Sequence, residues 1–122
     1  MKIKTSVGKI TTTLQWQFLE ENVSLKFQGR VDAEYSESKK LVIVAGADGV
    51  IRLLSIDGKQ ISEFSYENSE ICKFYTLAKN TITDLGVSIV MAHTPEYEGE
   101  RFWQHDIDII NKKVGGPTEK WR

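Results

Sequence analysis

The hydrophobic residues of this chain recur in short runs, either alternating or continuous, that are separated by turn-forming residues. β-Branched and aromatic side chains fill the runs, while glycine, aspartate and asparagine lie between them. This pattern is typical of antiparallel strands joined by tight turns. The stretch from Gln17 to Lys26 could hold a short helix, but the alternation of Val23 and Phe27 favours a turn followed by a strand. We therefore predict an all-β protein with little or no helix.

The clearest pattern runs from Leu41 to Phe64, where Asp48-Gly49 and Asp57-Gly58 separate three apolar runs. Asp-Gly favours a two-residue type I′ turn, in which both central residues have positive φ. The middle run, Val50 to Ile56, is apolar on both faces, which predicts a strand inside a sheet covered on both sides. Two-residue turns predict the cross-strand pairs Ala47–Val50, Val44–Leu53, Ile43–Leu54, Leu54–Ile61, Ile51–Phe64 and Arg52–Glu63.

A second unit, which begins at Cys72, follows the same plan with the runs CKFYTLAKN, GVSIVMAHT and RFWQHDIDIINKKV. A longer loop, Thr94 to Glu100, replaces its second turn. From Arg30 to the C-terminus, this strand order and turn spacing resemble single blades of β-propellers such as WD-repeat proteins. The resemblance implies two four-stranded antiparallel sheets. Two blades cannot close a ring, so we expect the sheets to pack face to face as a β-sandwich.

The chain length favours a single domain, because 122 residues can bury a core without disulfides or metals. We predict one β-sandwich domain over residues 1–122 with about 8 to 10 strands. Residues 1–29 supply N-terminal strands, residues 30–68 the first blade-like unit and residues 69–122 the second. The segments expected to add strands to the sheet edges are Lys2 to Thr5, Ile10 to Phe18 and Val23 to Phe27.

Charge indicates which classes of partner are favoured, and cysteine content indicates the cellular compartment. Sixteen basic residues nearly cancel 17 acidic ones, so no global field favours nucleic acid or an anionic membrane as a partner. Cys72 is the single cysteine, which excludes an internal disulfide and favours the cytoplasm. The start MKIKTSVGKITTT lacks the apolar core of a signal peptide, and we expect neither export nor membrane insertion.

The two histidines, His93 and His105, are the candidate metal ligands. The apolar face that their two strands share predicts the register Met91–Ile107 and Ile89–Ile109. That register sets the imidazoles side by side at the mouth of a hairpin. A zinc site needs three or four ligands, so we favour packed histidines and predict no metal. No glycine-rich phosphate-binding motif is present, and we predict no cofactor.

The residues near these histidines do not form a catalytic group in the predicted strands. Asp106 and Asp108 alternate with His105, so they point to the opposite face. Lys73 likewise points away from Cys72 and does little to activate its thiol, which favours a buried structural cysteine. We therefore predict that the protein is not an enzyme.

The loop TPEYEGERFW combines carboxylates with aromatic residues, the mixture that often supplies anchors at protein interfaces. A solvated acidic loop is the alternative. We predict that this segment binds a protein with a basic surface. The predicted partner-binding residues are Glu96, Tyr97, Glu98, Glu100, Arg101 and Trp103.

In size, build and lack of catalytic groups, the chain resembles the small β-sandwich immunity proteins of bacterial contact-dependent growth inhibition systems. The resemblance implies that it neutralises a toxin, most specifically a nuclease, by blocking the active site. Glu96, Glu98 and Glu100 would then mimic phosphates, with Tyr97 or Trp103 as the anchor. The alternatives are a propeller-like scaffold that forms a homodimer or larger assembly, and a metal-dependent enzyme built on the two histidines.

Overall fold

The computed structural model describes the whole chain, residues 1–122, and consists of eleven β-strands without a helix. It accordingly has no helix with the length and apolar character needed to cross a membrane. The all-β prediction is confirmed, with one strand more than the upper limit that we expected. The strands are β1 Lys4–Val7, β2 Thr11–Phe18, β3 Glu21–Gln28, β4 Val31–Ser36, β5 Leu41–Gly46, β6 Val50–Ser55, β7 Gln60–Ser65, β8 Cys72–Lys79, β9 Val87–Tyr97, β10 Glu100–Asp108 and β11 Lys113–Lys120.

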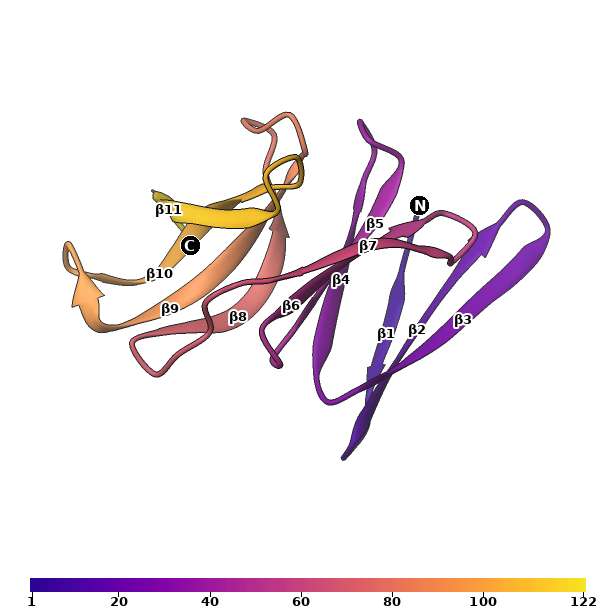
Figure 1. Ribbon diagram of the computed structural model, residues 1–122, viewed down its shortest axis with the longest axis horizontal. Helices are drawn as coiled ribbons and strands as arrows, with labels where there is room; N and C mark the ends of the chain where they lie inside the picture. Colours follow the sequence, from indigo (N-terminus) through magenta and orange to yellow (C-terminus); the bar gives the residue numbers. More distant parts are fainter.

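The strands form three antiparallel sheets, each with its strands in sequence order: β1-β2-β3, β4-β5-β6-β7 and β8-β9-β10-β11. The second and third sheets are the two predicted four-stranded units. The first sheet corrects our expectation, because the N-terminal strands pair with one another instead of extending the edges of the other sheets. The β4–β7 sheet lies between the other two, as Figure 1 shows.

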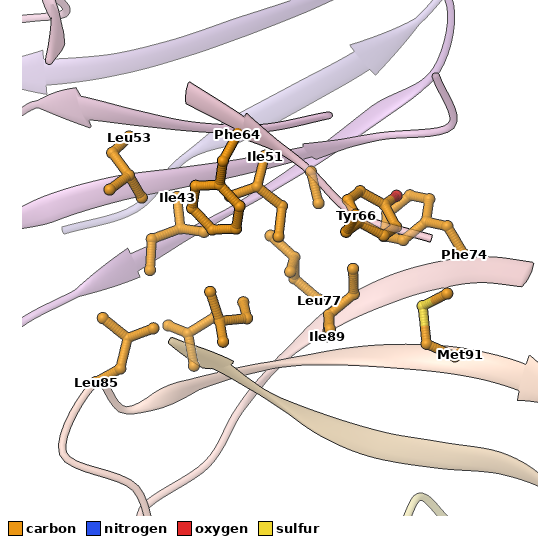
Figure 2. Packing of buried hydrophobic residues seen from close by; sticks show 13 residues of the cluster. Ile43, Ile51, Leu53, Phe64, Tyr66, Phe74, Leu77, Leu85, Ile89 and Met91 are labelled. Carbon is orange, nitrogen blue, oxygen red and sulfur yellow. The ribbon is translucent and has the colours of Figure 1, made fainter. Parts of the chain in front are cut away.

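Adjacent residues of a strand point to opposite faces, so the strands of the middle sheet can bury apolar side chains on both faces. One face packs against the β8–β11 sheet in a core of 13 buried residues, where Ile43 and Ile51 meet Ile89 (Figure 2). The other face packs against β1–β3 in a smaller core around Leu14 and Leu54. Strand β6 therefore has the inner, doubly covered position predicted for Val50 to Ile56.

Polar contacts fix the layers relative to one another. The Trp16 indole N–H donates to the Ile56 carbonyl oxygen across 2.7 Å, between the first and second sheets. The Thr76 hydroxyl donates to the Asp32 carboxylate at 2.7 Å, between the second and third. Buried donors need such partners, so these bonds select one packing arrangement.

Both Asp-Gly pairs lie in three-residue loops, not the predicted two-residue turns. Gly49 and Gly58 have positive φ, whereas the aspartates before them do not. A type I turn followed by a left-handed glycine gives this geometry. In the first hairpin the additional loop residue shifts the register by one, to Ala45–Ile51, Val44–Arg52 and Ile43–Leu53, so the predicted pairs Ala47–Val50, Val44–Leu53 and Ile43–Leu54 are wrong.

In the second hairpin, the predicted pairs Ile51–Phe64 and Arg52–Glu63 are confirmed. A register shift after Leu53 then pairs Leu54 with Gln60 instead of Ile61. As a result Ile61 is 60% exposed at the edge strand β7, while Leu54 stays buried. Because of this register shift, β6 and β7 can be joined by a three-residue loop while the Leu54 side chain stays buried.

Candidate functional site

The predicted partner-binding residues lie on the hairpin formed by β9 and β10. Tyr97 pairs with Glu100 around a two-residue turn, Glu98-Gly99, in which both residues have positive φ, 46° and 81°. Most of the predicted loop is therefore strand, because β9 continues to Tyr97. Below the turn the register shifts, so that residues 93–96 of β9 face only Arg101 of β10. This bulge, in which residues 93–96 lie opposite a single residue, separates the hairpin tip from the regular part of the sheet.

The tip exposes four of the six predicted residues. Glu96, Tyr97, Glu98 and Arg101 are exposed, and Tyr97 has 43% of its surface accessible. The Arg101 guanidinium lies over the Phe102 ring, 5.5 Å from its centre. Neither Glu96 nor Glu98 forms an ion pair within the chain, so both carboxylates are available to a partner.

The other two predicted residues, Glu100 and Trp103, have internal roles. Glu100 is only partly exposed, and its carboxylate pairs with Arg122 at 2.8 Å and with Lys120 at 3.9 Å. Trp103 is 6% exposed, and its indole N–H donates to the carbonyl oxygens of Tyr97 and Glu100 at 3.1 and 3.0 Å. The expectation that Trp103 could serve as an exposed anchor is therefore corrected: its indole fastens the hairpin from inside.

A cluster of His93, His105 and Cys72 lies at the base of the same hairpin. The two imidazole rings are nearly parallel, at an angle of 15°, and meet edge to edge, with centres 5.1 Å apart and Nε2 atoms separated by 2.9 Å. The prediction that they lie side by side is confirmed. The predicted register is wrong, because His105 pairs with Ile89 and Trp103 with Met91. The imidazoles meet although their backbones are not paired, since His93 lies at the start of the bulge.

Cys72 joins the histidines because β8 pairs with β9 in a register that sets Cys72 opposite His93. The Cys72 Sγ atom lies 3.9 Å from His93 Nε2. Sequence reasoning missed this contact. The contact could have been predicted only from the register of β8 against β9. That register changes between Phe74 and Thr76, so alternation along the strands does not predict which residues are paired.

Hydrogen bonding assigns the protons of the cluster. His105 Nδ1–H donates to the Gly115 carbonyl oxygen at 2.8 Å, which leaves His105 Nε2 to accept from His93 Nε2–H. Burial lowers the pKa of both imidazoles below the ordinary histidine value, so both are neutral near pH 7. Burial, together with the charge of Glu67, raises the pKa of the Cys72 thiol.

The neighbouring aspartates stand apart from this cluster. Asp106 is exposed, whereas His105 next to it is buried, as strand alternation predicts. Asp108 accepts hydrogen bonds from the backbone N–H groups of Ile110 and Asn111 at 3.1 and 2.9 Å and closes the β10–β11 turn. These contacts give Asp108 a structural role.

A second surface feature is a groove of about 740 Å³ between the β8–β9 loop and strands β10 and β11. Ile82 and Ile110, which are 79% and 86% exposed, lie along it. It is on a different part of the third sheet from the hairpin tip.

The sequence matches no protein-family model and no curated protein, and no solved structure matches either. The resemblances to propeller blades and to immunity proteins therefore stay predictions.

Proposed function

We propose that this protein is a non-enzymatic protein-binding module whose contact surface is the tip of the β9–β10 hairpin. The observation that carries the proposal is the exposure of Tyr97 between Glu96 and Glu98, two carboxylates without ion-pair partners in the chain. An exposed aromatic residue flanked by carboxylates suits a partner with a basic surface and an apolar pocket.

The tip is held in place before any partner arrives. The Trp103 indole bonds to backbone oxygens on both sides of the turn, at Tyr97 and Glu100. The Glu100 carboxylate pairs with Arg122 and Lys120, which ties the hairpin to the C-terminal segment. A preorganised loop loses less conformational entropy on binding, which leaves more of the contact energy for affinity.

The three tip side chains supply different parts of the interaction. Tyr97 offers a large amphipathic ring with few rotatable bonds, which is typical of interface anchors. Glu96 and Glu98 add negative charge, which accelerates association with a basic surface and disfavours acidic competitors. Glu100 is not available for this purpose, because its charge is already compensated by Arg122 and Lys120.

The most specific form of the proposal is an immunity protein that covers the active site of a cognate nuclease toxin. In that role Glu96 and Glu98 occupy the positions of substrate phosphates, and Tyr97 fills a neighbouring pocket. This level of detail comes from the resemblance to small β-sandwich immunity proteins. It also predicts that the gene for the partner lies directly beside the gene for this chain.

The test begins with a pull-down from the native host, followed by affinity measurements on the recovered partner. We expect Tyr97→Ala to weaken binding about 30-fold or more, the effect of an interface hot spot. The double variant E96Q/E98Q should slow association and remove most of the salt dependence of its rate. The matched control is E20Q/E21Q, which removes two exposed glutamates from the β2–β3 hairpin and should bind like the unchanged protein.

Two results would argue against this function. Recovery of no basic partner would remove the class of partner proposed. Unchanged affinity and association rate in Tyr97→Ala and in E96Q/E98Q would remove the hairpin tip as the contact surface. If the recovered partner is a nuclease, equal cleavage of nucleic acid with and without this protein would contradict the inhibitory role.

A further inference from the structure

We propose that Cys72, His93 and His105 form a zinc-binding site, with the Cys72 thiolate and the two imidazole Nε2 atoms as ligands. The three side chains come from β8, β9 and β10, and no two of their donor atoms are more than 4.8 Å apart. Nitrogen and sulfur are the donors that zinc prefers in proteins, and three protein ligands with one open position form a common zinc site. Zinc binding here goes beyond partner recognition at the hairpin tip and does not depend on it.

The present distances are close to those of a tetrahedral site. With Zn–N of ~2.0 Å and Zn–S of ~2.3 Å, two nitrogen ligands lie roughly 3.3 Å apart, and a nitrogen and a sulfur roughly 3.5 Å. The two Nε2 atoms are 2.9 Å apart, and Cys72 Sγ is 3.9 Å from His93 Nε2. The sulfur has to approach His105, and the His93 ring has to turn, because its Nε2 atom now points straight at His105 Nε2. Cys72 and His93 are both half-buried, so their side chains can rotate.

The hydrogen bond behind His105 prepares this residue as a ligand. Its Nδ1–H donates to the Gly115 carbonyl oxygen at 2.8 Å, which fixes the ring and directs the Nε2 lone pair toward the cluster. His105 is only 4% exposed, so packing also holds its orientation. A carbonyl acceptor on the distal nitrogen is the usual support of a zinc-bound histidine.

Protons balance when zinc binds. In the metal-free cluster, His93 Nε2–H donates to His105 Nε2. This proton has to move to His93 Nδ1 before His93 Nε2 can bind zinc. Solvent can carry the proton, because the His93 ring is only half-buried. Cys72 releases its thiol proton to solvent as the Zn–S bond forms. One thiolate and two neutral imidazoles then bind Zn²⁺, and one proton is released per ion bound.

The charges around the cluster favour a cation. The carboxylate of Glu67 acts on Cys72, and that of Asp106 acts on His105. Bound zinc would join β8, β9 and β10 at the base of the hairpin, where the His93 ring lies 5.8 Å from that of Tyr97.

The experiment uses the full chain, reduced and stripped of metal with a chelator, near neutral pH. Titration with Co²⁺, a coloured substitute for Zn²⁺, should saturate at one ion per chain. It should also produce a thiolate-to-cobalt charge-transfer band with the intense visible bands of tetrahedral coordination. Calorimetry with Zn²⁺ should give the same stoichiometry. Thermal unfolding should shift to higher temperature in the presence of the ion, because the metal binds the folded state.

Cys72→Ser should abolish the charge-transfer band, and Cys72→Ser and His93→Gln should each weaken zinc binding at least ~100-fold. Neither residue is fully buried, so both variants are expected to fold, which circular dichroism checks. The matched control E96Q/E98Q removes two nearby carboxylates and should bind the metal unchanged.

Absence of stoichiometric Co²⁺ and Zn²⁺ uptake would overturn the site. Uptake that is equal in Cys72→Ser and His93→Gln would place the metal elsewhere and overturn it as well. Uptake of Cu⁺ alone would overturn the assignment to zinc. If the E96Q/E98Q variant no longer binds the partner but still binds the metal, the zinc site and the proposed protein-binding surface are independent of each other.

Discussion

At the scale of single residues, Tyr66 joins the end of the middle sheet to the larger core. Its ring is buried, and its hydroxyl donates to the Gly46 carbonyl oxygen at 2.6 Å. Tyr66→Phe keeps the ring and removes only this hydrogen bond. We expect the free energy of unfolding to fall by about 1 kcal/mol, as measured by urea denaturation near neutral pH. An unchanged free energy of unfolding would mean that this hydrogen bond makes no net contribution to stability.

The same tyrosine should make the protein sensitive to alkali. Burial, aided by the charge of Asp48, raises the pKa of Tyr66 above the ordinary tyrosine value of about 10. The folded state therefore holds the proton more tightly than the unfolded state. Its contribution to stability is complete below about pH 10 and is lost as the pH rises further.

Stability should consequently decline more steeply above about pH 10 in the unchanged protein than in Tyr66→Phe. Denaturation midpoints across the alkaline range measure this difference. Tyr75→Phe is the matched control, since Tyr75 is 43% exposed and its hydroxyl is not in the core. Parallel curves for the unchanged protein and Tyr66→Phe would contradict the account.

Prediction from the sequence was uneven at this scale. The meeting of His93 and His105 could be predicted, because both lie on strands of one hairpin. Their contact with Cys72 could not, because it depends on the register of β8 against β9 and on a shift within that pairing. Burial of Trp103 was also missed, since a tryptophan in an acidic loop sequence looks the same whether it points in or out.

At the scale of elements, the β6–β7 loop packs closely against the first sheet. Gly58 has φ of +91°, and a Cβ atom there would lie 2.7 Å from Val23 Cγ1. Gly58→Ala should therefore lower the free energy of unfolding by about 1 to 3 kcal/mol through backbone strain and the clash. Gly116→Ala is the control, because Gly116 has open space around it and should tolerate alanine. Equal stability of the two variants would contradict this packing.

Strand positions were largely predictable, whereas registers were predictable only in part. Apolar runs locate the strands, because each must bury one face. Asp-Gly marks a turn but does not distinguish a two-residue from a three-residue loop, since both need a glycine with positive φ. The first hairpin is therefore displaced by one residue, while Arg52–Glu63 in the second is as predicted.

At the scale of the whole molecule, the middle sheet belongs to both hydrophobic cores, so the three layers should unfold together. Leu14→Ala opens the smaller core, and Ile89→Ala opens the larger one, each at a fully buried position. Each should cost about 3 kcal/mol and leave one cooperative transition, seen alike by tryptophan fluorescence and circular dichroism. Two separate transitions would show that the layers are independent.

The sequence was least informative about how the layers stack. Two four-stranded units follow from the repeated strand and turn pattern. The separate first sheet does not, because its strands are short amphipathic segments that could equally extend an existing edge. The choice depends on Leu14 and Trp16, whose side chains fill a core against Val42 and Leu54. Such a contact between distant segments leaves no local pattern.

Binding of a protein partner at the β9–β10 tip can be measured by amide hydrogen exchange of the chain alone and in complex with the partner recovered from its host. Binding at the tip should slow exchange at residues 94–101 and leave the β2–β3 hairpin unchanged. Protection confined to the groove beside Ile82 and Ile110, with the tip exchanging as in the free protein, would contradict it.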